Sequence, residues 1–128
     1  MKKTVFMDKY PVYSIEFLKS ELRYSSAKEI VEYFKEKILN HPVAEFIAVF
    51  DHYAHTKKLN GDIMDGLLDA QNVIFCFGKA IPATKILAVR PRSIGISEFE
   101  DKIVIDFMEA PKEDLQKVMQ DWTKGLKL

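Results

Sequence analysis

The sequence predicts an α+β protein: a single-domain, curved, mainly antiparallel sheet with two long amphipathic helices packed mainly on one face. Two long segments carry apolar residues every three or four positions, as amphipathic helices do. Two late runs are separated only by the polar pair Glu100-Asp101, as in an antiparallel hairpin. Two further runs are apolar on both faces, which is typical of strands inside a sheet. A sheet with its helices gathered on one side accommodates all three observations.

The composition is that of an ordinary folded protein. The chain has 128 residues, about one domain, so we expect residues 1–128 to fold as a single unit. Its 19 basic side chains balance 19 acidic ones, so we expect no nucleic-acid partner. The lone Cys76 lies in an apolar run, which predicts a buried thiol and favours a reducing compartment. The sequence has neither a signal-peptide core nor a membrane-spanning run, which predicts a cytoplasmic protein with no membrane partner.

The first third of the chain is expected to form strands and one helix. Residues 1–10 have no clear period, so they are expected to be an N-terminal arm or an edge strand. From Val12, apolar and polar side chains alternate as in a half-buried strand. Ser26 and Glu29 have the spacing of a capping box at the start of a helix. That helix should end before Pro42, since proline restricts the residue that precedes it.

The middle of the chain is expected to hold two inner strands around an irregular region. The runs 45–50 and 72–78 are apolar on both faces and predict the inner strands. Residues 51–58 are expected to form a short helical turn closed by Asn60-Gly61. A further short helix is expected over 62–68.

The last third begins with a short helix expected to start at Pro82 and to point Ala83, Ile86 and Leu87 inward. A hairpin over 94–108 follows. Pro111 opens a final helix, and its spacing places one apolar stripe on a single side. The residues of that stripe are Leu115, Val118, Met119, Trp122 and Leu126.

Short motifs between Ser26 and Trp122 resemble domain-of-unknown-function family 302, whose fold is grouped with TATA-binding-protein-like structures. The resemblance is carried by Asp51-His52, by Phe75-Cys-Phe-Gly78, by the strand before Met108 and by Ala110-Pro111. Lys79 and Ala80 stand where that family usually has asparagine and proline. The resemblance implies a curved sheet gripping a long helix, often in a homodimer, and no established activity.

Asp51, His52 and His55 are the candidate catalytic or metal-binding residues, at the end of an apolar strand. A carboxylate and two imidazoles suit a divalent metal, and an imidazole oriented by a carboxylate suits acid–base catalysis. The alternative is structural: Asp51 caps a helical turn while the histidines lie at the surface.

Lys79, Arg90 and Arg92 are the candidate anion-binding residues, within a stretch from Ala70 to Ser97 that has no acidic side chain. Gly78-Lys79 before a helix start would bring free N–H groups beside a cation. The alternative is a solvated basic face.

The sequence carries no complete catalytic or cofactor motif, so no cofactor is predicted and an enzymatic activity stays open. The expected function is non-enzymatic binding of a small-molecule ligand or a protein partner in a groove between sheet and helix, in a homodimer. The alternative is a metal-binding protein or an acid–base enzyme that uses Asp51, His52 and His55.

Overall fold

The computed structural model describes residues 1–128 and contains one six-stranded antiparallel sheet, in the order β1-β2-β6-β5-β4-β3. The strands are β1 (Lys2–Phe6), β2 (Tyr10–Leu18), β3 (Ala44–Asp51), β4 (Asp69–Phe77), β5 (Arg92–Glu98) and β6 (Lys102–Met108). The helices are α1 (Ala27–Leu39), α2 (His52–Lys58), α3 (Ile86–Val89) and α4 (Glu113–Lys124), with a single 3-10 turn, η1 (Lys19–Glu21).

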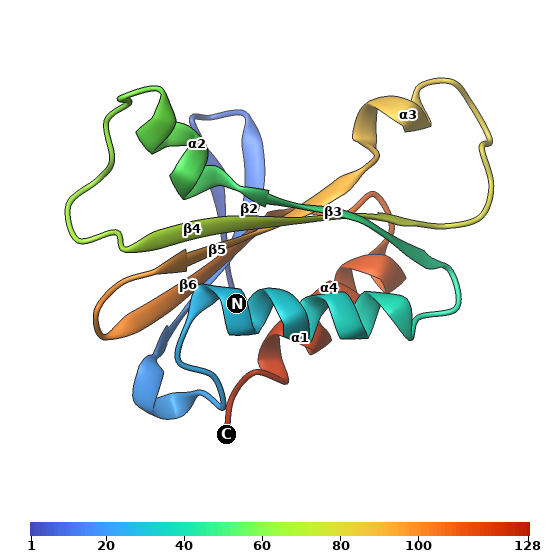
Figure 1. Ribbon diagram of the computed structural model, residues 1–128. Coiled ribbons are helices and arrows are strands. Elements are labelled where there is room, and N and C mark those ends of the chain that lie inside the picture. The colour runs from blue at the N-terminus through green and yellow to red at the C-terminus, as the bar shows by residue number, and fades with distance from the viewer.

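The two long helices, α1 and α4, lie side by side on one face of the curved sheet (Figure 1). Alternate residues of the central strands, such as Phe75, Ile96 and Ile105, point toward these helices and are fully buried or nearly so. Ile30 and Phe34 of α1 and Met119 of α4 meet them from the helix side. The predicted α+β fold, with a curved antiparallel sheet and both long helices on one face, is therefore confirmed.

The start of α1 follows the predicted capping box only in part. Ser26 Oγ accepts from the backbone N–H of Glu29 at 3.2 Å, as expected for an N-cap. The Glu29 carboxylate accepts from the hydroxyls of Ser25 and Ser26. Glu98 of β5 accepts from the N–H of Ala27 at 2.8 Å, so a strand carboxylate completes the cap and ties α1 to the sheet.

The helix α4 is joined to its neighbours by buried polar contacts. Gln116 Oε1 accepts from the Ala110 N–H at 2.8 Å, which fixes the segment between β6 and α4. The Tyr33 hydroxyl of α1 donates to the Trp122 carbonyl at 2.6 Å. Burial raises the pKa of Tyr33, so this hydroxyl stays a donor at neutral pH. Trp122 also packs on Phe77, with ring centroids 5.4 Å apart.

Two predictions about the middle strands are wrong. β3 was expected to be an inner strand, but it lies at the edge of the sheet and is mostly exposed, Phe50 included. A bulge between Phe46 and Ala48 shifts the register of β3 against β4. The apolar side chains on its two faces therefore do not all pack into the core. Cys76 is half-buried on the face away from α1 and α4, because β4 alternates and its neighbours Phe75 and Phe77 take the core side.

Two predicted short helices also differ in the structure. Residues 62–68 form no helix; the N–H of Leu68 donates instead to the Glu98 carbonyl, which leads the chain directly into β4. The helix expected from Pro82 begins only at Ile86, and none of its residues is buried. Four residues are too short to hold an apolar stripe against the sheet.

On the sheet face away from α1 and α4, one row of paired residues crosses every strand and is polar in four of the six. In order from β3 to β1 the row is Phe50, Asn72, Gly95, Asp106, Ser14 and Lys2. The Ser14 hydroxyl donates to the Asp106 carboxylate. These half-buried polar contacts explain why this face lacks the continuous apolar surface of the other.

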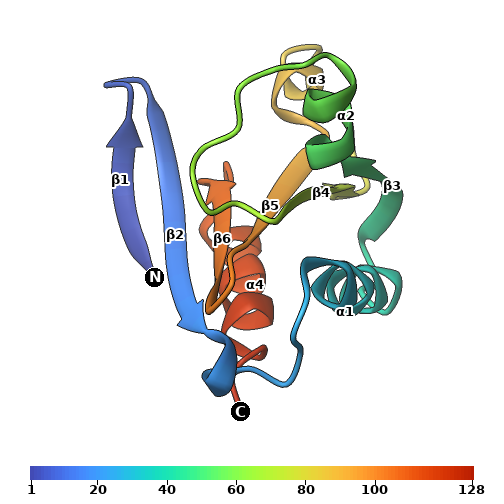
Figure 2. The same cartoon turned by 60° about the vertical axis from the view of Figure 1, so that its left-hand side comes forward.

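The hairpin of β1 and β2 lies at one side of the molecule, and Figure 2 shows its two strands side by side. Its turn contains Met7 and Asp8, both with positive φ, as a tight hairpin turn requires. Residues 1–10 therefore contain an edge strand, the second of the two arrangements expected from the sequence. No helix in the structure has the length and apolar character needed to cross a membrane.

Candidate functional site

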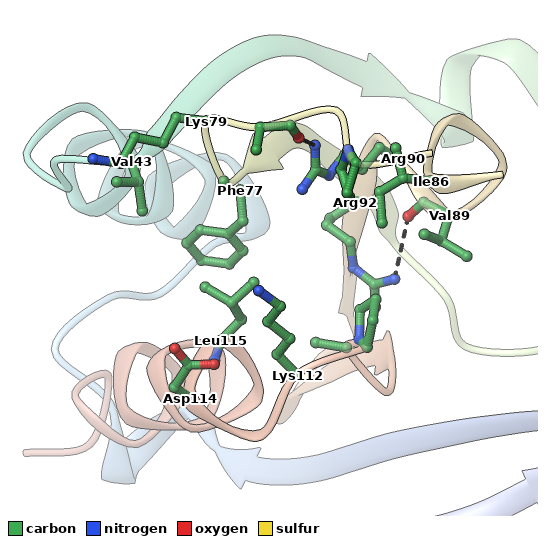
Figure 3. Close-up of a pocket in the computed structure, with 15 residues that line it drawn as sticks. Val43, Phe77, Lys79, Ile86, Val89, Arg90, Arg92, Lys112, Asp114 and Leu115 are labelled. Carbon is green, nitrogen blue, oxygen red and sulfur yellow. Dashed lines mark hydrogen bonds between the residues drawn. The ribbon is translucent and has the colours of Figure 1, made fainter. Parts of the chain in front are cut away.

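A pocket of about 310 Å³ lies where the segment 78–91 faces the start of α4 (Figure 3). Segment 78–91, which includes α3, forms one wall, and the first turn of α4 forms the opposite wall. Apolar side chains supply much of the lining, among them Phe77 from the end of β4 and Leu115 from α4. Four basic side chains stand around them: Lys79, Arg90, Arg92 and Lys112. Small-ligand pockets commonly have this mixture of apolar walls and few polar groups.

Arg90 packs closely against Gly78, the glycine that follows β4. Its Nη1 donates to the Ala80 carbonyl at 2.8 Å. A Cβ added at Gly78 would lie 2.7 Å from Arg90 Nη2, and Gly78 has a φ of +90°, which other residues rarely adopt. Glycine is therefore needed here both for the turn and for the close approach of the guanidinium.

Arg92 forms the deepest basic group of the pocket. Its Nη2 donates to the carbonyls of Met108 and Glu109, the latter at 3.1 Å, and its Nη1 donates to Val89. Burial lowers the pKa of Arg92, yet a guanidinium stays protonated in proteins. Its Nε–H is buried and has no hydrogen-bond partner in the protein. Arg92 therefore contributes positive charge to the pocket while its terminal nitrogens are bonded to the backbone.

The start of α4 adds a further cation, Lys112. Lys112 is the N-cap residue, and no side chain caps this helix start. In Figure 3 the Lys112 side chain extends toward the space between Phe77 and Arg92. Asp114 is the one acidic side chain in the lining, and its Oδ1 accepts from the N–H of Leu115 at 3.0 Å. The positive end of the helix dipole adds to the cationic character of the pocket.

A second hollow, of about 380 Å³, lies on the other side of the segment 78–91. Its lining includes Cys76 and Ile47, whereas the first pocket is lined by Phe77. Because successive strand residues point to opposite faces, the two hollows lie on opposite faces of the sheet. Gly78, Lys79, Ala80 and Arg90 line both.

The predicted residues Asp51, His52 and His55 lie near one another but do not converge on one point. Asp51 Oδ1 accepts from the N–H of Ala54 at 2.9 Å and so caps α2. The rings of His52 and His55 are 6.4 Å apart, and both pack against Phe50. No group of three His, Cys, Asp or Glu side chains in the protein is arranged to hold a metal ion. Of these three side chains, Asp51 makes the cap contact that the structural alternative describes.

His52 instead belongs to a short chain of hydrogen bonds on the open face. Its Nδ1 lies 3.1 Å from Asn72 Oδ1, and Asn72 Nδ2 donates to Ser93 Oγ at 3.0 Å. The imidazole donates to the Asn72 oxygen in the tautomer that carries its hydrogen on Nδ1. His41, at the other end of β3, packs against Phe77 and Trp122.

Sequence reasoning identified three of the four basic residues of the pocket and missed Lys112. Lys79, Arg90 and Arg92 share the acid-free stretch, whereas Lys112 follows a strongly acidic segment. Pro111, which precedes Lys112, is a helix-start signal that could have pointed to it. No local pattern in the sequence could predict that α4 faces the segment 78–91, since this arrangement depends on the order of the strands.

The comparisons with known proteins identify a family without a known activity. A family model described as "Family of unknown function (DUF6858)" matches residues 1–128. This match corrects the resemblance to domain-of-unknown-function family 302, which was wrong: the shared motifs were short and apolar, and strands of many folds contain such runs. No curated protein and no solved structure matches the chain significantly.

Proposed function

Since the chain belongs to DUF6858, a family of unknown function, its role has to be inferred from its own side chains, and we propose that it is a non-enzymatic binding protein for a small organic carboxylate. The binding site is the pocket between segment 78–91 and α4. The observation that carries the proposal is a largely apolar pocket whose lining includes four basic side chains and a single acidic one. We also place the protein in the cytoplasm, because its single cysteine favours a reducing compartment.

The basic side chains have different roles in this proposal. Arg92 has three backbone carbonyls as acceptors, so it mainly holds β5, α3 and the end of β6 together. Lys112 has no ion-pair partner and extends toward the apolar centre, which suits it to bind the carboxylate. Arg90 would supply a second donor, since its Nη1 alone is used by Ala80.

The apolar lining accounts for the rest of the ligand. Phe77, Ile86 and Leu115 offer carbon surface on three sides of the pocket. A volume of about 310 Å³ is at the lower end of the range of small-ligand pockets, which is about 300–1,000 Å³. A straight-chain or aromatic acid of modest size fits this lining better than a large polar anion. The other function considered, acid–base or metal chemistry, has less support because Asp51 is used as a helix cap.

The test is a calorimetric titration of the purified protein with straight-chain carboxylates from butanoate to octanoate. Each added methylene is expected to tighten binding about fourfold until the pocket is full, because burial of one CH₂ contributes about 0.8 kcal/mol. Lys112→Met, which keeps the aliphatic stem, is expected to weaken binding about tenfold, because a hydrogen bond to a charged group contributes about 1.5–3 kcal/mol.

Lys85→Met is the matched control. Lys85 lies in the segment 78–91 that borders the pocket, but it is not part of the pocket lining. It should bind the carboxylates as the unmodified protein does. Inorganic phosphate that binds as tightly as octanoate would show that the apolar walls take no part. Equal affinities of the Lys112→Met and Lys85→Met proteins would remove this pocket as the site.

A further inference from the structure

We infer that β1 is the interface for a second copy of this chain, which pairs with it as an antiparallel strand about a two-fold axis centred on Thr4. β1 is the last strand of the sheet, so the backbone groups on its outer side meet no other strand. All five of its residues are exposed. An uncovered edge strand with free N–H and C=O groups is a template for pairing with another chain.

The apolar residues of the hairpin favour a partner at this edge. Phe6 is 59% exposed and Met7 is 68% exposed, and Val5 and Tyr10 beside them are exposed as well. Such a run of neighbouring apolar side chains is unusual on a monomer and marks an interaction site. No other part of the fold covers these side chains, since all four are exposed.

The sequence of β1 complements itself in the antiparallel direction. Lys2 and Lys3 lie at one end, and Val5 and Phe6 lie at the other. Pairing centred on Thr4 sets each lysine opposite an apolar residue of the second copy, so no lysine faces a lysine. The Lys3 ammonium is already held by Glu109 at 2.9 Å, which leaves its aliphatic stem to cover Val5 of the second copy. A parallel pairing in register would oppose like charges, which is unfavourable.

The opposite edge of the sheet, β3, is also exposed and apolar, but it is less regular than β1. β3 contains a bulge between Phe46 and Ala48, and bulges interrupt the regular ladder that edge pairing needs. Lys35 of α1 also lies over the Phe46 ring, 4.9 Å from its centre. The two edges therefore differ, and a dimer joined through β1 is closed by its two-fold axis.

Substitution of the residue on the two-fold axis tests this interface. Thr4→Lys and Thr4→Glu each place like charges opposite each other across the two-fold axis. Each should raise the dimer dissociation constant, measured by sedimentation velocity, at least about tenfold. An equimolar mixture of the two variants should restore the dimer, since opposite charges then face each other. Ala48→Lys adds the same charge to the exposed edge strand β3 and should leave the dimer intact.

A cross-linking experiment fixes the register independently. In the Cys76→Ala background, Thr4→Cys should form an intermolecular disulfide with itself, because paired antiparallel residues have Cα atoms about 4.5–5.5 Å apart. Lys2→Cys alone should not, but a mixture of Lys2→Cys and Phe6→Cys should. A protein that stays monomeric at all concentrations would overturn the inference, as would a dimer that Thr4→Lys and Thr4→Glu leave unchanged.

Discussion

Gly78, directly after β4, and Gly95, within β5, show how differently a single added Cβ acts at two positions. Gly78→Ala is expected to destabilise the protein by about 1–3 kcal/mol, because Gly78 has a φ of +90° and its Cβ would meet Arg90 Nη2 at 2.7 Å. Gly95→Ala should cost less, since its Cβ would meet the Asp106 carbonyl at 3.4 Å and Asn72 Nδ2 at 3.8 Å with an ordinary strand backbone. Urea denaturation of both variants measures the difference. A cost at Gly95 that equals the cost at Gly78 would contradict this account.

At the scale of single residues, the sequence was informative where charge was concerned. The absence of acids from Ala70 to Ser97 singled out Lys79, Arg90 and Arg92, and all three line the pocket between segment 78–91 and α4. The histidines were harder to interpret. The partner of His52 is Asn72, which lies on another strand, and no local pattern of residues reveals such a contact.

The ion pair between β1 and the end of β6 predicts a pH dependence for the edge of the sheet. The hydrogen bond from Lys3 lowers the pKa of Glu109 below 4.5, and the same contact raises the pKa of Lys3 above 10.5. The unfolded chain therefore binds a proton at Glu109 more readily, so the stabilisation is present at neutral pH. It is lost as the pH falls from 4.5 through the lowered pKa of Glu109.

Glu109→Gln is accordingly expected to lower the melting temperature slightly at pH 7, because both partners are exposed and such pairs contribute little. The difference from the unmodified protein should shrink below pH 4.5 and disappear once Glu109 is protonated. It should also shrink above pH 10.5, as Lys3 loses its charge. Glu36→Gln, at a carboxylate outside every ion pair, is the control. A difference that stays constant at all pH values would contradict the assigned pairing.

At the scale of elements, the long helices could be predicted because their signals are local. In α1, the capping residue Ser26 and the apolar stripe lie within a few turns of each other. The apolar stripe of α4 is equally short in sequence. The edge position of β3 could not be predicted in this way. Its residues are apolar on both faces, as in an inner strand, but burial depends on whether a strand lies on each side, and the segment after β3 folds into α2 instead.

The two faces of the sheet give a prediction about the molecule as a whole. Phe75 is fully buried between the sheet and the helices, and the next residue toward the N-terminus, Ile74, is half-buried on the opposite face. Phe75→Ala is expected to cost about 3–5 kcal/mol, a large part of the 5–15 kcal/mol typical of a whole protein. Ile74→Ala should cost clearly less. Chemical denaturation gives both values, and equal costs would mean that the open face is covered.

At the scale of the whole molecule, the fold class could be predicted but the order of strands could not. The run of elements along the chain indicated helices on one face of an antiparallel sheet. However, β2 pairs with β6 across most of the chain's length, which no local pattern reveals. The end of β4, the start of β5 and the end of β6 lie at one edge of the sheet, because these strands are successive antiparallel neighbours, and this places the start of α4 beside the segment 78–91. The pocket is lined by residues between Val43 and Leu115, so no single stretch of sequence contains it.

The segment 78–91 stands between two hollows on opposite faces of the sheet, and Gly78, Lys79, Ala80 and Arg90 border both. This segment is therefore the shared wall of the two hollows. A displacement of the segment that widens one hollow narrows the other. A molecule bound in one hollow would therefore weaken binding in the other, although the two molecules would not touch. The Arg90 side chain lines both hollows and is bonded to the Ala80 carbonyl, so it would move together with the shared wall.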